Sequence, residues 1–228
     1  SVQDFRATGY LPEVLNNFLA LLGWSTGDDR ERLSMDELVS EFSLGRIGRA
    51  NAKFDYKKLT AFNTEACENA SPDRLLAAMK DFLAQNPESP LTQADDNQLA
   101  DLLRMNAGFH VLAEVDEKSR FFFTPVTKIT YDEKAVEKVL RKGEPSGMEH
   151  LMALRDVLAE FETWTVESIE SAVRELCEQR GAGLGKVAQP ARVAVSGGTV
   201  SPPIFDTLAY LGKDETLARI DHCVATVG

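Results

Sequence analysis

Apolar residues recur at helical spacing along most of the chain. The first run of this kind contains five apolar residues: Val14, Leu15, Phe18, Leu19 and Leu22. Their spacing places them on one face of an α-helix. Pro12 suits the first turn of that helix and Gly23 suits its end. The pattern therefore predicts an amphipathic helix that buries this face.

A second helix is predicted where Ser34 and Glu37 have the separation of a capping box. Leu38 and Phe42 are expected on its buried face.

A third helix is predicted in the segment "FDYKKLTAFNTEAC", with Leu59 and Phe62 directed inward and Lys57 outward. Farther along, Ser71 directly precedes Pro72, and this pair is typical of a helix N-terminus. We expect a domain boundary at this point.

The second half of the chain continues the helical pattern. Glycine and asparagine interrupt a leucine-rich run at 106–108, so two helices are expected to meet there. A loop precedes a short helix that is predicted from about Asp132. Two longer helices follow, the second capped by Thr165 and ending at Gly181.

Strand signals are nearly absent. The segment "RVAVSGGTV" alternates for a few residues, so it could be a short strand or part of a helix that begins after Pro190. Residues 201–228 predict two more helices, separated at Leu211 and Gly212. About ten helices and no fixed repeat predict an all-α fold that is not a solenoid.

Composition narrows the classes of function. The 228 residues are 43% hydrophobic and 27% charged, as in ordinary globular proteins. A net charge of -11 excludes a sequence-blind binder of polyanions, so any nucleic-acid contact must be local. No apolar run is long enough to span a membrane and the first residues do not resemble a signal peptide, so we expect a cytoplasmic protein without membrane contact.

The sequence carries no local motif for catalysis. G-x-S-x-G, G-x-x-x-x-G-K-[ST] and H-E-x-x-H are all missing. The cysteines and histidines are too scattered to predict a disulfide framework or a metal site: Cys67, Cys177, Cys223, His110, His150 and His222. A hydrolase or transferase whose site is assembled from distant residues stays open as a minor alternative.

Three stretches together resemble one family, the bacterial-type glutamyl-tRNA synthetases, which are class I ligases. They are "GYLPEVLNNFLALLGWS" at 9–25, "KFDYKKLTAFN" at 53–63 and "GKVAQPARVAVSGGTVSPPIFDTLAYLGKDETLARI" at 185–220. The first resembles the family's segment after its K-M-S-K-type loop, and the last resembles its terminal signature. Their order and spacing cover almost the whole chain.

The resemblance implies a chain without its catalytic half. In this family ATP, Mg and glutamate bind a Rossmann-type domain with H-I-G-H-like and K-M-S-K-like strings, and neither string is present. Ser1 would directly follow the K-M-S-K-type loop, and no initiator methionine precedes it. We therefore expect a C-terminal portion of a longer synthetase, inactive alone, with no cofactor of its own.

The resemblance also implies a division into three helical regions. Residues 1–70 would be a stem-contact region, and residues 71–131 and 132–228 would be two small subdomains that form a cage around the anticodon loop. Rigid helices suit this task, because they hold a few side chains against unstacked bases. The expected partners are a tRNA and the missing N-terminal catalytic domain, and the expected state is a monomer.

Arg192 in "QPARVAV" matches the position of an anticodon-reading arginine in the family. Its planar fork of donors suits base edges and phosphate. Gln189 and Lys186 flank it on what we expect to be one loop, where Lys186 would neutralise phosphate. A surface ion pair of Arg192, and simple solvent exposure of the other two residues, are the alternatives.

One departure from the family concerns the third anticodon base, which is a cytosine in glutamate tRNAs. The family commonly places an arginine for it just before the phenylalanine that matches Phe109, and here that position is Gly108. Glycine offers no side-chain donor, so Arg104 or Asn106 would have to replace the arginine. We hypothesise an enzyme relaxed toward glutamine tRNA.

The distribution of charge favours RNA contact near the C-terminus. Residues 181–228 hold equal numbers of cationic and anionic side chains: Lys186, Arg192, Lys213 and Arg219 against Asp206, Asp214, Glu215 and Asp221. The excess negative charge therefore lies in residues 1–180.

Two features favour other interpretations. The aromatic run Phe121, Phe122 and Phe123 resembles a base-stacking platform but is more typical of a core plug. An acidic helical bundle could also be a free-standing adaptor that binds proteins rather than RNA.

Overall fold

The computed structural model describes residues 1–48 and 53–228 and divides into two compact units, residues 1–117 and 118–228. The described residues form thirteen α-helices with a few short 3-10 and π turns and no sheet, only two isolated bridges. The all-α prediction is confirmed. The predicted regions 1–70, 71–131 and 132–228 stay a prediction. Among the described helices, none is long and apolar enough to cross a bilayer.

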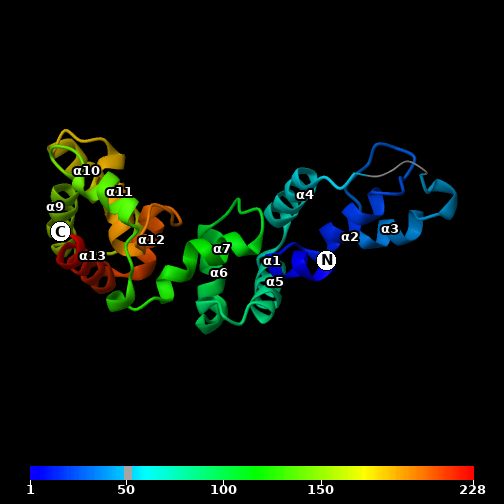
Figure 1. Cartoon of the computed structure of the whole chain (residues 1–228), viewed down its shortest axis with the longest axis horizontal. Helices are drawn as coiled ribbons and strands as arrows, with labels where there is room; N and C mark the ends of the chain where they lie inside the picture. The colour runs from blue at the N-terminus through cyan, green and yellow to red at the C-terminus, as the bar shows by residue number, and fades with distance from the viewer. Residues whose placement is uncertain (49–52) are drawn as a thin grey trace. The chain divides into compact units, whose positions relative to one another are not determined.

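Unit 1 contains the first seven α-helices, the last of which runs two residues past its end (Figure 1). Two 3-10 turns, Leu44–Arg46 and Pro90–Gln93, connect some of them. The helices are α1 (Val2–Thr8), α2 (Pro12–Leu21), α3 (Met35–Glu41), α4 (Tyr56–Asn69), α5 (Pro72–Gln85), α6 (Asp96–Met105) and α7 (Leu112–Ser119).

Local signals placed the starts of α3 and α5 correctly, whereas α1, which is capped by Ser1, was not predicted. Ser34 and Glu37 form the predicted capping box at α3, and Ser71 caps α5 with Pro72 in its first turn. Phe42, however, is 52% exposed, so its prediction as a buried residue is wrong. The reason is that α3 ends at Glu41 and the backbone of Phe42 is extended, which stops the helical periodicity.

Leu19 on α2 is another predicted core residue that the structure exposes, at 39%. On α4, in contrast, Leu59 and Phe62 are buried as predicted and Lys57 is exposed.

A buried amide on α4 connects this helix to two other segments of unit 1. Asn63 accepts from the backbone N–H of Leu11 at 2.8 Å and donates to a backbone carbonyl of the segment before α7 at 2.6 Å, so it replaces the solvent lost on burial.

Unit 2 begins with two 3-10 turns, Arg120–Phe123 and Val126–Lys128. A short α-helix then runs directly into a π-helix, the rare wider form in which the chain makes i to i+5 bonds. The elements that follow these turns are α8 (Glu133–Ala135), the π-helix η5 (Val136–Arg141), α9 (Gly147–Ala159), α10 (Val166–Gln179), α11 (Leu184–Ser196), α12 (Ile204–Leu211) and α13 (Lys213–Val227).

The segment around Pro190 is helical, which resolves the choice between strand and helix. Helix α11 begins at Leu184, so the expected loop around Lys186, Gln189 and Arg192 is wrong. Pro190 lies inside the helix, where proline costs about 3 kcal/mol or more. Burial of the neighbouring valines and alanines offsets this cost.

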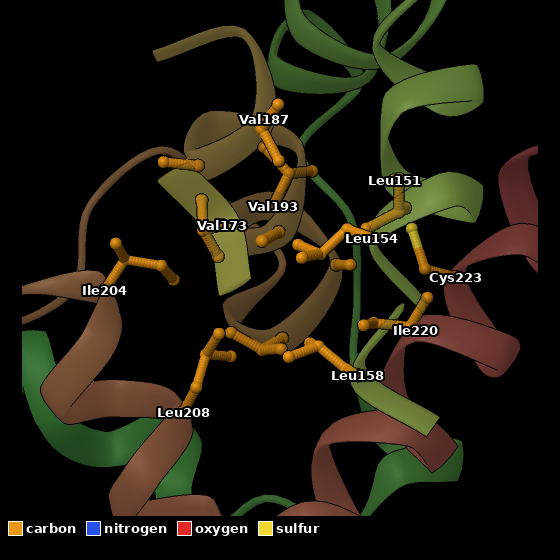
Figure 2. Close-up of a cluster of buried hydrophobic side chains, with 14 of the residues drawn as sticks. Leu151, Leu154, Leu158, Val173, Val187, Val193, Ile204, Leu208, Ile220 and Cys223 are labelled. Atoms are coloured by element: carbon orange, nitrogen blue, oxygen red, sulfur yellow. The ribbon is translucent and has the colours of Figure 1, made fainter. Parts of the chain in front are cut away.

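The core of unit 2 lies among α9, α10, α11, α12 and α13 (Figure 2). Leu151, Leu154 and Leu158 of α9 belong to this core together with residues of the other four helices, and the close-up shows Leu158 beside Ile220 of α13. Phe121 also belongs to this core at 8% exposure, and its ring packs against Phe122. The prediction of a core plug is confirmed for Phe121.

Candidate nucleic-acid interface

Arg192 lies on α11 and is half-buried. Its Nε donates to Ser201 Oγ at 2.9 Å, and burial lowers the pKa of its guanidinium. Within the described part of the chain no carboxylate pairs with it, so the alternative of a surface ion pair is not realised. The bond to Ser201 engages Nε, and the two terminal nitrogens form no hydrogen bond among the described residues.

Lys186 and Gln189 lie about one turn apart on α11 and both line a pocket of about 300 Å³ in unit 2. Arg192 lies a further three residues along the helix and does not line it. The structure therefore brings two of the three predicted residues to one wall. The full lining is Lys138, Val139, Lys142, Gly143, Pro145, Gly147, His150, Gly185, Lys186, Gln189 and Pro190.

A close backbone approach builds the opposite wall of this pocket. Gly147 begins α9, and a Cβ placed on it would lie 1.8 Å from the carbonyl oxygen of Val139 in η5. Only glycine allows the two elements to approach so closely. This contact brings Lys138 of η5, and Lys142 directly after η5, to the same pocket as the start of α11.

Sequence reasoning missed Lys138, Lys142 and His150. The two lysines are four positions apart, a spacing that places side chains on one face of a helix. This spacing is visible in the sequence. Nothing in the sequence indicates, however, that the short predicted helix lies next to α11. In the sequence His150 is one of three scattered histidines, with no neighbouring motif that indicates a site.

The other predicted residues lie in unit 1. Arg104 and Gly108 line a pocket of about 380 Å³ beside the end of α6. Asn106, in contrast, is buried and donates to the carbonyl of Leu102 at 2.8 Å as the C-cap residue of α6. Asn106 therefore serves the helix end, whereas the side chain of Arg104 is 67% exposed and reaches Asp101 at 3.1 Å.

The charge argument for residues 181–228 needs a correction. Arg219 is fully buried and donates to backbone carbonyls, and Lys213 donates to the carbonyl of Phe161 at 2.7 Å. Both cations are held by hydrogen bonds within the fold. They are therefore not available to attract an anionic ligand to the surface. Lys186 and Arg192 remain, and the additional lysines of the pocket come from residues before 181.

In the described segments, no three histidine, cysteine or carboxylate side chains lie together in an arrangement that could hold a metal ion. All three cysteines are free thiols and buried. Burial raises the pKa of Cys67 to about 12 and that of Cys223 to about 11, which keeps both thiols protonated at neutral pH.

Comparisons with known proteins agree on one family. A family profile described as an anticodon binding domain matches residues 74–224. A glutamate-tRNA ligase of Desulforudis audaxviator is 36% identical over 234 residues, which cover 100% of this chain and 46% of that protein. Glutamate-tRNA ligase 2 of Rhodospirillum rubrum is 40% identical over 219 residues, which cover 96% of this chain and 46% of that protein.

The fold agrees as well. The crystal structure of a glutamate tRNA ligase from Elizabethkingia meningosepticum matches with a TM-score of 0.79 and 29% identity, over 96% of this chain and 42% of that one. The chain thus spans about half the length of the relatives it matches. The resemblance to glutamyl-tRNA synthetases that the sequence indicated is confirmed, and the adaptor interpretation is not favoured. By its match over 74–224, the chain belongs to the family of anticodon binding domains.

Proposed function

We propose that this chain recognises the anticodon loop of a tRNA as the C-terminal part of a glutamyl-tRNA synthetase. The observation that carries the proposal is the match of residues 74–224 to an anticodon binding domain. The lysine-lined pocket of unit 2 supports it, because a protein of net charge -11 needs a local cationic site to approach RNA.

The complete protein would attach glutamate to its tRNA with ATP and Mg in a catalytic domain outside this chain. The residues present here do not fit that chemistry, since the H-I-G-H-like and K-M-S-K-like strings are missing from the sequence. The chain acts by positioning the tRNA, within the same polypeptide as the catalytic domain. The complete protein is proposed to be monomeric and cytoplasmic.

Arg192 and Gln189 would read anticodon bases, and Lys186 would contact phosphate. The guanidinium is held by Ser201 and its terminal nitrogens are available, which suits a side chain that must hydrogen-bond a base edge in one orientation. The lysine is a flexible point charge and suits the backbone of the RNA rather than a base.

Unit 1 would contact the third anticodon base near Gly108. The backbone of Gly108 has φ of +88°, and open space lies where a Cβ would point. With no side-chain donor at this position, Arg104 is the lining residue whose guanidinium carries several hydrogen-bond donors. The proposal includes relaxed discrimination, so that glutamine tRNA is also accepted.

Titration with an anticodon stem-loop tests the proposed function. Saturable binding by the whole chain is expected, and Arg192→Ala should weaken it by about 1 to 3 kcal/mol, the range known for base-reading side chains. Arg155→Ala is the matched control, because Arg155 forms an exposed pair with Asp221. The absence of binding at micromolar protein in low salt would contradict the proposal and favour an adaptor that binds proteins rather than RNA.

A further inference from the structure

The pocket of unit 2 concentrates positive charge on an acidic protein. Lys138, Lys142 and Lys186 all line it, and its lining contains no aspartate or glutamate. Across the described residues none of these three ammonium groups forms an ion pair. Three cations without a carboxylate among them give the pocket a locally positive potential that favours an anion.

A buried histidine supplies an independent observation at the same pocket. His150 is a lining residue, is only 2% exposed, and its Nε2 has no hydrogen-bond partner among the described residues. Buried polar atoms almost always have a partner, so an unsatisfied donor at the edge of a cationic pocket is a candidate contact for an anion. The other ring nitrogen, Nδ1, lies 3.0 Å from Nε of Arg180.

That contact fixes which nitrogen carries the proton. A guanidinium can only donate, so Nδ1 of His150 must accept, and a neutral ring then carries its hydrogen on Nε2. Burial lowers the pKa of His150, and the positive charges of Arg180 and Lys186 lower it further. The ring is therefore neutral near pH 7 and presents Nε2–H as a donor without an acceptor. Arg180, the partner of Nδ1, does not line the pocket, whereas the ring of His150 does.

We propose that this pocket is a binding site for a backbone phosphate of single-stranded RNA, with Lys138, Lys142 and Lys186 around the oxyanion and His150 Nε2 donating to one of its oxygens. The proposal rests on the proposed function and adds a phosphate site that anchors the RNA beside the base-reading residues of α11. A metal cation does not fit, because the lining offers ammonium groups and no carboxylate ligand.

Phosphate is the anion that these groups suit. Lysines bind it as mobile point charges, and a neutral imidazole N–H adds a directed bond. Gly143 and Gly147 contribute backbone to the lining of the pocket. Phosphate contacts fix the position of a nucleic acid while base contacts specify its sequence, so the pocket would position the loop for Gln189 and Arg192.

The first test measures the salt dependence of stem-loop binding. Removing two of the three lysines around the one phosphate in Lys138→Ala/Lys142→Ala should reduce the slope of log K against log salt by up to about 0.7, the contribution of one single-strand phosphate contact. Both side chains are exposed, so the variant should fold normally. The matched control is Lys128→Ala/Lys134→Ala, two exposed lysines of the same unit that lie outside the pocket.

The outcomes of this test separate the two proposals. A slope equal to that of the control, in a protein that still binds the stem-loop and still loses affinity in Arg192→Ala, overturns the phosphate site and leaves the proposed function intact. A wild-type chain that binds no stem-loop overturns the proposed function itself.

The second test observes the histidine directly by long-range ¹H–¹⁵N NMR. Stem-loop RNA should shift the Nε2 signal of His150 in the wild type, and this shift should need about tenfold more RNA or more in Lys138→Ala/Lys142→Ala, because removing both contacts weakens binding. His222 on α13 is the internal reference. A shift caused by inorganic phosphate but not by the stem-loop would assign the pocket to a free anion and overturn the proposal.

Discussion

Arg219 donates from Nη1 to the backbone carbonyl of Phe121 at 3.0 Å, across 98 positions of the chain. The same guanidinium also donates to the carbonyls of Val195 at 2.8 Å and Thr124 at 2.9 Å, and its Nε pairs with Glu215 at 2.7 Å. The side chain is fully buried. It therefore joins the end of α11 and the turn that opens unit 2 to α13.

Replacing this arginine should destabilise unit 2 strongly. Arg219→Met keeps much of the volume but removes the donor of the Val195 and Thr124 carbonyls, whereas the Phe121 carbonyl keeps the N–H of Thr124. Each unsatisfied buried group costs about 1 to 3 kcal/mol. We expect the free energy of unfolding to fall by about 3 kcal/mol or more, measured by urea denaturation with circular dichroism. Arg155→Ala, which breaks an exposed pair, should cost about 1 kcal/mol or less; a similar small loss in Arg219→Met would contradict this role.

The chemistry of Arg192 predicts a loss of selectivity when only its shape is changed. Arg192→Lys keeps the positive charge but removes the planar fork and the Nε that donates to Ser201. Preference for the cognate anticodon over a loop with substituted bases should drop by tenfold or more, with little change in salt dependence. Fluorescence titration with paired stem-loops checks both quantities. Equal preference in variant and wild type would remove Arg192 from the base-reading role.

Gly108 predicts a gain of discrimination. Gly108→Arg places donors on the pocket wall where the family commonly has them, and no atom lies within 4 Å of the new Cβ. The positive φ should cost about 1 to 2 kcal/mol of stability. Two stem-loops that differ only in cytosine or guanine at the third anticodon base should then be separated more strongly than by the wild type.

Gly108→Ala is the matched control for this change, because it carries the same backbone cost without a donor. A wild type that already prefers cytosine by a hundredfold or more would contradict the proposed relaxed specificity. Thermal unfolding of both variants separates the backbone cost from the effect on binding.

Asp28 predicts a pH dependence in unit 1. Its carboxylate accepts from the hydroxyl of Thr26 and from Arg30, and these hydrogen bonds lower the pKa of Asp28 to about 2. Because the pKa is depressed in the folded state, the stabilisation is present above the ordinary pKa of 3.8 and is lost as the pH falls toward 2.

Removing the hydroxyl should therefore raise the pKa of Asp28 toward its ordinary value. A ¹³C NMR titration of the carboxyl group in Thr26→Val measures this change. Thr8→Val is the control, since the hydroxyl of Thr8 donates to a backbone carbonyl at 2.8 Å and not to a carboxylate. An unchanged pKa of Asp28 in Thr26→Val would show that Arg30 alone holds it.

The predicted helix starts followed from local chemistry. Ser34 and Ser71 accept hydrogen bonds from the first turn of their own helices, and a cap needs only residues within a few positions. Around Pro190, in contrast, distant partners decided the outcome. The helix through Pro190 forms because its valines and alanines are buried in a core of five helices, and that packing outweighs the proline.

The sequence by itself determined the all-α class, most helix starts and the family resemblance, because periodicity, caps and motifs are properties of neighbouring residues. Tertiary structure alone decided which cations are available. It buried Arg219 against carbonyls and placed Lys138 and Lys142 beside His150 and the start of α11. Such meetings depend on how packed elements approach, as at Gly147, and no local pattern encodes that distance.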